Sequence, residues 1–88
     1  MAKIKIVGLS SGESTPFDGQ YVVEYDPARE GIDPNGRVMT AHLVTTPDRA
    51  KAKEYKLEEA IAELRRSHGL RPDGKPNRPL TAFTVSIE

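Results

Sequence analysis

The feature that most constrains the fold is a change of hydrophobic period along the chain. Residues 3–7, 21–25, 38–44 and 80–87 alternate apolar and polar side chains, as half-buried strands do. Between the last two of these segments, apolar residues recur at helical spacing over residues 57–64. The sequence therefore predicts the element order β-β-β-α-β.

These elements predict an α+β fold. A single helix can cover one face of about four strands, so we expect one mostly antiparallel sheet of about four strands with the helix packed on one face. The long connection after the helix leaves the direction of the last strand open. We expect this strand to lie beside the first one.

Chain length and composition favour one small domain. With 88 residues the chain has room for one thin core, so a single domain over residues 1–88 is expected. The absence of cysteine excludes disulfides and zinc–thiolate sites and favours a cytoplasmic location. No stretch approaches about 18 consecutive apolar residues, so no membrane span is expected.

Capping patterns locate the helix. Two overlapping registers at residues 45–48, each with a threonine as the N-cap, predict a helix that begins near residue 47. Tyr55 lies off the apolar stripe, so we expect a short first turn, a kink near this residue and the main helix over residues 57–67. Gly69 can adopt the left-handed conformation of a C-cap and is the predicted helix end.

The apolar faces of these elements predict one shared core. In strand 21–25 the alternation places Tyr21, Val23 and Tyr25 on one face. The predicted core consists of Ile4, Ile6, Tyr21, Val23, Leu43, Leu57, Ile61, Leu64, Phe83 and Val85.

No pattern predicts a catalytic or metal site. His42 and His68 are the only candidates for a neutral-pH base, and neither has a carboxylate or a second histidine at helical metal-pair spacing. Glu58 and Glu59 are adjacent on the predicted helix, so their carboxylates diverge by about 100° and cannot converge on one substrate. We expect no catalytic residue, metal or cofactor, and no enzymatic activity.

The strongest local charge asymmetry lies in residues 65–78, although the chain has no net charge. Five cations stand there against Asp73 alone. This segment is interpreted either as an anion-binding surface or as a helix end followed by a proline-stiffened turn with a structural role. The candidate partner-binding residues are Arg65, Arg66, Arg71, Lys75, Asn77 and Arg78.

Three segments resemble small uncharacterised proteins encoded in bacteriophages and prophage-containing bacterial genomes. They are the run GQYVVEYD at residues 19–26, the spacing Ala52-x-x-Tyr55-x-x-x-Glu59-Ala60, and the ending RPDGKPNRPLTAFTVSIE. The resemblance covers most of the chain and implies no activity.

Together these observations favour a non-enzymatic binding or accessory module, of phage origin if the resemblance holds. It would recognise a protein or other anionic partner through the helix C-terminus and the following loop. The alternative is a weak nucleic-acid-binding protein that acts mainly through phosphate contacts, although residues 65–78 lack the aromatic side chains on which bases stack. Lys3 and Lys5 in the first strand and prolines near strand ends disfavour edge pairing, so a monomer is expected.

Overall fold

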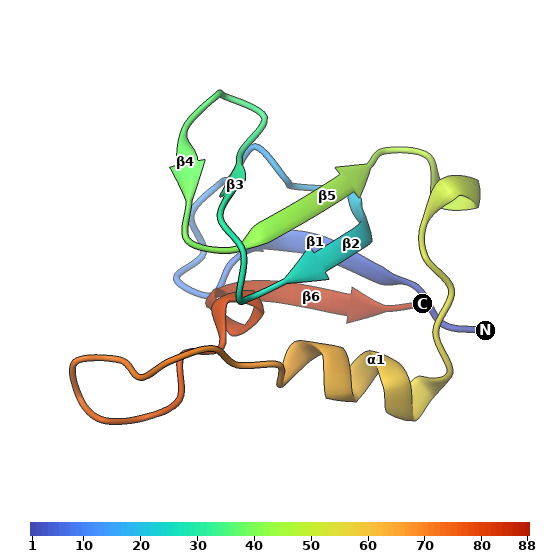
Figure 1. Cartoon of the computed structure of the whole chain (residues 1–88). Coiled ribbons are helices and arrows are strands. Elements are labelled where there is room, and N and C mark those ends of the chain that lie inside the picture. The colour runs from blue at the N-terminus through green and yellow to red at the C-terminus, as the bar shows by residue number, and fades with distance from the viewer.

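The computed structural model describes residues 1–88 and has an α+β fold with two antiparallel sheets (Figure 1). The larger sheet has the strand order β5 (His42–Thr46), β2 (Tyr21–Asp26), β1 (Ile4–Leu9) and β6 (Phe83–Ile87). The smaller sheet is a hairpin of β3 (Gly31–Ile32) and β4 (Val38–Met39). The predicted α+β class is confirmed, and β6 pairs with β1 as expected.

The predicted single sheet and the order β-β-β-α-β differ from the structure because the predicted third strand is divided. Its first residues form β4, its last residues belong to β5, and β3 arises between the predicted second and third strands, where no strand is expected. Asp33 stabilises the hairpin, because its side chain accepts hydrogen bonds from the backbone N–H groups of Asn35 and Arg37, both at 2.9 Å. The chain order is therefore β-β-β-β-β-α-β.

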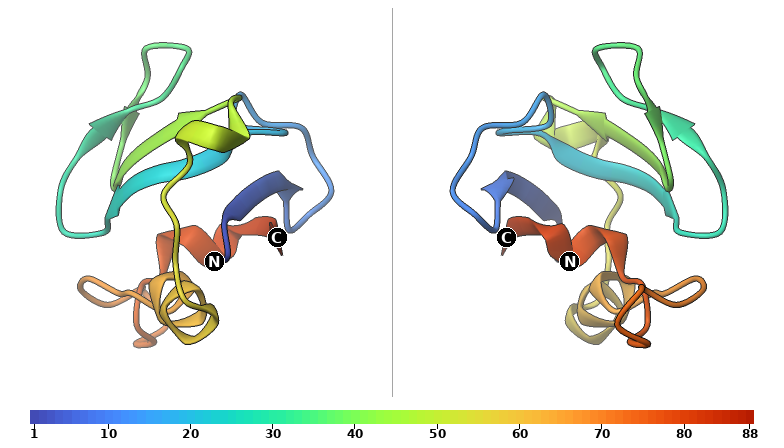
Figure 2. Two further views of the ribbon diagram at one scale, coloured as in Figure 1. Left: turned by 90° about the vertical axis from the view of Figure 1, so that its right-hand side faces the viewer. Right: turned by 90° about the vertical axis from the view of Figure 1, so that its left-hand side faces the viewer.

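The two central strands of the larger sheet pair only over a short stretch and then diverge (Figure 2). β1 and β2 are in register at Lys5 and Tyr21, beside two backbone hydrogen bonds that join Ile6 to Gly19 and Gln20, just before β2. The segment before the helix bridges the opening: Ala2 and Tyr55 exchange backbone hydrogen bonds of 2.6 and 2.7 Å, and the Lys53 N–H donates to the Val22 carbonyl at 3.1 Å. Figure 2 shows this segment running from the level of β2 and β5 down to that of β1 and β6.

A bulge in β2 changes which side chains face the core. The register with β5 shifts between Val22 and Glu24, so strict alternation fails at this point. Val22 is fully buried while Val23 is only half-buried. The predicted placement of Val23 on one face with Tyr21 and Tyr25 is therefore wrong.

The helical region is shorter than predicted. Asp48 caps a 3₁₀ turn, η1 (Arg49–Lys51), by accepting a hydrogen bond from the Ala50 N–H at 3.0 Å. The α-helix, α1 (Leu57–Leu64), ends three residues before the predicted position 67. No helix of the structure combines the length and the apolar character needed to cross a membrane.

The buried face of α1 is rotated from the predicted one. Ala60 is completely buried, and the Glu63 side chain beside it on the helix is only 10% exposed. Residues three or four positions apart share a face, so this rotation leaves Leu57 and Ile61 at the edge of the contact. They are 58% and 40% exposed, and their assignment to the core is wrong.

The core lies between the inner face of the larger sheet, α1 and a second 3₁₀ turn, η2 (Pro79–Ala82). η2 replaces the predicted start of the last strand and turns Leu80 inward. Phe17, from the connection between β1 and β2, packs edge-to-face on Phe83 at 5.8 Å. The buried cluster is Ile4, Ile6, Phe17, Val22, Tyr25, Ala41, Leu43, Tyr55, Ala60 and Leu80, with Leu64, Phe83 and Val85 packed against it.

The edges of the larger sheet are β5 and β6, so the lysines of the first strand protect neither edge. Lys3 is buried and its Nζ donates to the Arg49 carbonyl at 2.7 Å. Lys5 lies with its Nζ 5.8 Å from the centre of the Tyr21 ring. The two lysines therefore give no support to a monomer, and the oligomeric state stays a prediction.

Candidate partner-binding surface

Residues 68–77 form a small hairpin, which we call the tongue. Its two sides are joined by backbone hydrogen bonds from His68 to Asn77 at 3.0 Å, from Asn77 to Gly69 at 3.2 Å and from Arg71 to Lys75 at 2.8 Å. Gly69 has a left-handed φ of 67°, but it lies near the start of the tongue and does not cap the helix. The C-cap of α1 is Arg65. Figure 1 shows the tongue in orange, extending beyond the C-terminal end of α1.

Asp73 organises the tip of the tongue. Its carboxylate accepts two hydrogen bonds from Arg71, at 2.6 Å from Nη2 and 3.2 Å from Nε, and one from the Lys75 N–H at 3.1 Å. These bonds hold the pKa of the Asp73 carboxyl below its ordinary value, with the Arg71 contact as the main cause. Arg71, one of the predicted partner-binding cations, is therefore already paired with the Asp73 carboxylate.

Three of the predicted residues, Arg71, Lys75 and Arg78, line one shallow depression of about 360 Å³, which we call the basic depression. Its other lining residues are Pro76 and Thr81. The Arg78 carbonyl accepts from the Thr81 hydroxyl at 2.7 Å, which fixes the backbone at the start of η2. None of the ion pairs in the structure involves Lys75 or Arg78.

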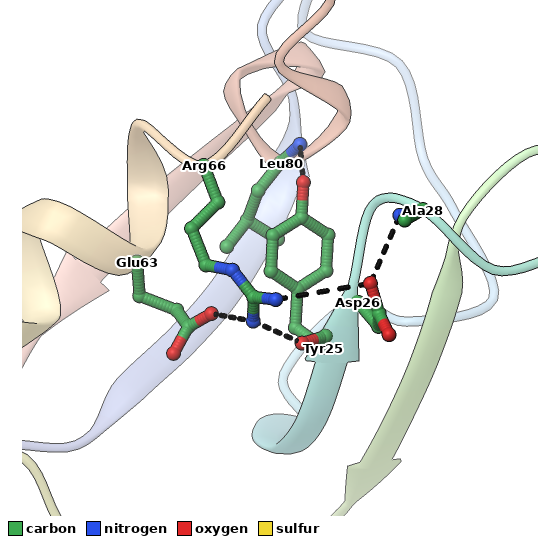
Figure 3. Close-up of polar contacts among 6 residues, drawn as sticks. All are labelled: Tyr25, Asp26, Ala28, Glu63, Arg66 and Leu80. Carbon is green, nitrogen blue, oxygen red and sulfur yellow. Dashed lines mark hydrogen bonds and ion pairs between the residues drawn. The ribbon is translucent and has the colours of Figure 1, made fainter. Parts of the chain in front are cut away.

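Arg66 has a different role, shown in Figure 3. Its Nη1 donates to the Tyr25 carbonyl at 2.6 Å and to the Glu63 carboxylate at 2.7 Å, and its Nη2 lies 3.7 Å from Asp26. The guanidinium also lies over the Tyr25 ring, 5.7 Å from its centre. Arg66 thus ties the end of α1 to the end of β2, and both hydrogen bonds of its Nη1 are made within the molecule.

Replacing Arg66 with alanine should destabilise the fold by about 1–2 kcal/mol, because the Tyr25 carbonyl and two carboxylates lose a shared donor. The estimate is kept small because the Arg66 side chain is partly exposed and its ion pairs are screened. Arg65→Ala is the matched control: Arg65 is exposed and makes no side-chain ion pair, so a change within about 0.5 kcal/mol is expected. Urea unfolding of both variants measures the difference, and equal stabilities would contradict the role assigned to Arg66.

A larger groove has no charged lining residue and borders the same segment, residues 77–79, as the basic depression. It has a volume of about 460 Å³ and lies between β4 and the start of β5 on one side and η2 with the start of β6 on the other. The Tyr25 hydroxyl within it accepts a hydrogen bond from the Leu80 N–H at 3.3 Å (Figure 3). The lining residues of this apolar groove are Tyr25, Val38, Met39, Thr40, Ala41, Leu43, Asn77, Pro79, Leu80, Ala82 and Phe83.

The predicted residues thus divide into groups. Arg71, Lys75 and Arg78 share the basic depression, and Asn77 lines the apolar groove next to it. Arg65 is exposed at the end of α1 but lines neither hollow, and Arg66 binds Tyr25 and Glu63. The groove itself was missed, because its walls come from segments far apart in the sequence and none of its residues is charged.

A third, polar hollow contains a histidine–carboxylate pair. His42 Nε2 lies 3.0 Å from Glu24 Oε2 across β5 and β2, and this contact is the main cause of the lowered pKa of Glu24. The hollow is also lined by Asp26, Arg29 and Lys53. No group of three or more potential metal-ligating side chains forms in the structure.

Comparison with protein-family models, with curated proteins and with solved structures gives no match. The resemblance to phage-encoded proteins stays a prediction. The function is therefore argued from the surface.

Proposed function

We propose that the protein is a non-enzymatic binding module that recognises an acidic segment of a protein partner through the basic depression. The observation that carries this proposal is the convergence of Arg71, Lys75 and Arg78 on one hollow, where Lys75 and Arg78 have no ion pair. Carboxylates bound there would form charge-assisted hydrogen bonds with these side chains. Such contacts favour specificity and fast association more than high affinity.

The aromatic residues favour a protein partner over a nucleic acid. Proteins that bind single strands stack bases on exposed rings. All five aromatic residues of this chain contribute to its interior: Phe17, Tyr21, Tyr25 and Tyr55 are buried, and Phe83 packs on the core. Nucleic-acid binding through phosphate contacts remains the alternative, and the same experiment tests it.

The test is fluorescence polarisation with a labelled short peptide rich in aspartate and glutamate, compared with its asparagine and glutamine counterpart. We expect the acidic peptide alone to bind, and to bind more weakly when the salt is raised from about 50 mM to about 300 mM, because exposed charges are screened. Labelled single- and double-stranded oligonucleotides are titrated in parallel. Tighter binding of an oligonucleotide than of the acidic peptide would replace the proposal with the nucleic-acid alternative.

Two double variants test whether the acidic peptide binds at the basic depression. A chain with Lys75→Ala and Arg78→Ala should bind the acidic peptide about tenfold more weakly, which is the effect of losing about 1.4 kcal/mol. A chain with Arg29→Ala and Lys51→Ala loses the same charge at exposed sites outside the depression and should bind almost normally. Circular dichroism checks that both chains fold. Equal losses in the two variants, or no binding by the parent, would overturn the proposal.

A further inference from the structure

We infer that the apolar groove binds an apolar side chain of the same partner segment whose acidic residues contact the basic depression. This inference rests on the proposed function and names the chemistry of the partner. The partner segment would carry an aliphatic or aromatic residue flanked by aspartate or glutamate.

The two hollows are adjacent along the chain. Asn77 and Pro79 line the apolar groove, and Arg78 between them lines the basic depression. Arg78 has a φ of −118° and a ψ of 83°, so the backbone is open rather than helical at this point. Successive side chains of an extended backbone point to opposite sides, so the two hollows lie on either side of this segment, and a ligand that crosses residues 77–79 would contact both.

The groove has the chemistry of a site for an apolar group. Its volume of about 460 Å³ lies in the range of about 300–1,000 Å³ common for ligand sites. None of its lining residues is charged, and the Tyr25 hydroxyl is already hydrogen-bonded to the Leu80 N–H. Val38, on the β4 wall, is 75% exposed, so an occupant would remove apolar surface of the protein as well as its own from water.

Charge complementarity selects the occupant. An apolar group alone would leave Lys75 and Arg78 without a counter-ion, and a nucleic acid would satisfy the cations but leave the groove empty. A segment with an apolar residue between acidic ones fills both hollows. The chain itself exposes Leu57 beside Glu58 and Glu59, so self-association is measured as a competing outcome.

The experiment compares three labelled peptides of equal length. The first has two central leucines and acidic ends, the second has central serines and the same acidic ends, and the third has central leucines with glutamine ends. We expect the serine peptide to bind about tenfold more weakly than the leucine peptide, which matches the burial of about one leucine side chain. The difference should persist at about 300 mM salt, because burial of apolar surface is not screened.

Substitutions in the apolar groove test whether the preference for the leucine peptide arises there. Val38→Asn makes the wall polar and Ala82→Leu narrows the groove at an exposed position, so each should weaken binding of the leucine peptide at least threefold and leave the serine peptide unaffected. Ile32→Asn is the matched control, because Ile32 pairs with Val38 in the hairpin and is similarly exposed but does not line the groove.

The outcomes separate this inference from the proposed function. If the leucine and serine peptides bind equally and both lose affinity in the Lys75 and Arg78 variant, the groove inference is overturned and the proposed function stands. If neither peptide binds, both are overturned. If light scattering shows a dimer that the leucine peptide does not dissociate, the groove is an interface between copies of the chain and the inference is also overturned.

Discussion

Leu80→Ala should lower the free energy of unfolding by about 2–5 kcal/mol, the usual cost of emptying a buried leucine site. Leu80 is 1% exposed and belongs to the core cluster. Leu70→Ala is the matched control in the tongue, where the leucine is 73% exposed, and should change stability by less than about 0.5 kcal/mol. The loss at Leu80 is large for a domain of this size, whose total stability is expected near the low end of about 5–15 kcal/mol.

Urea unfolding followed by circular dichroism measures both leucine variants, and Leu80→Met should cost less than about 1.5 kcal/mol because it conserves volume. The comparison also tests how the last segment folds. If residues 80–87 were one continuous strand, Leu80 would lie on the opposite face from Phe83. A Leu80→Ala variant as stable as the parent would therefore contradict the inward position that η2 gives to this side chain.

Gly31→Ala should destabilise the protein by about 1–3 kcal/mol, the usual cost of forcing extra volume into a packed site. A Cβ at position 31 would lie 2.8 Å from the Ala41 carbonyl oxygen and 3.0 Å from the His42 Cα, both in the backbone. The hairpin can move away only by losing its contact with the start of β5. Because the β4 wall of the apolar groove belongs to this hairpin, peptide binding should weaken as well.

The matched control for Gly31 is Gly8→Ala in β1. A Cβ there would meet the Glu13 carbonyl oxygen at 3.4 Å, an ordinary contact, and Gly8 has no left-handed conformation to lose. Alanine also restricts the unfolded chain, so the change should lie within about 1 kcal/mol of the parent in either direction. Thermal unfolding of the pair gives the comparison, and a Gly31→Ala variant with the stability of Gly8→Ala would show that the hairpin does not depend on close approach.

The elements that the sequence predicted well are those set by local pattern. Alternation marked β1, β2 and β6, and helical spacing marked α1, because these periods follow from backbone geometry alone. The errors occur where distant contacts decide the outcome. The bulge beside Val22 coincides with the point where Lys53 bonds to β2, and the rotation of α1 follows from the burial of Ala60 and Glu63.

The candidate site shows the same division. The charge pattern identified Arg71, Lys75 and Arg78, which the structure brings to one hollow. It could not show that Arg66 is bound by the Tyr25 carbonyl, because that partner is 41 positions away. Nor could it reveal the apolar groove, whose walls are joined only when the β3–β4 hairpin and η2 fold against the same core.

The short pairing of β1 with β2 divides the larger sheet into two antiparallel ladders, β1 with β6 and β2 with β5, that would open as separate cooperative units if their junction failed. That junction has two parts: the backbone hydrogen bonds of Ile6 with Gly19 and Gln20, and the bridging segment around Lys53 and Tyr55, which leads directly into α1. Loss of the bridging bonds alone would free the segment that leads into α1, whereas Arg66 would still tie the end of the helix to β2 and the tongue would still be continuous with η2 and β6.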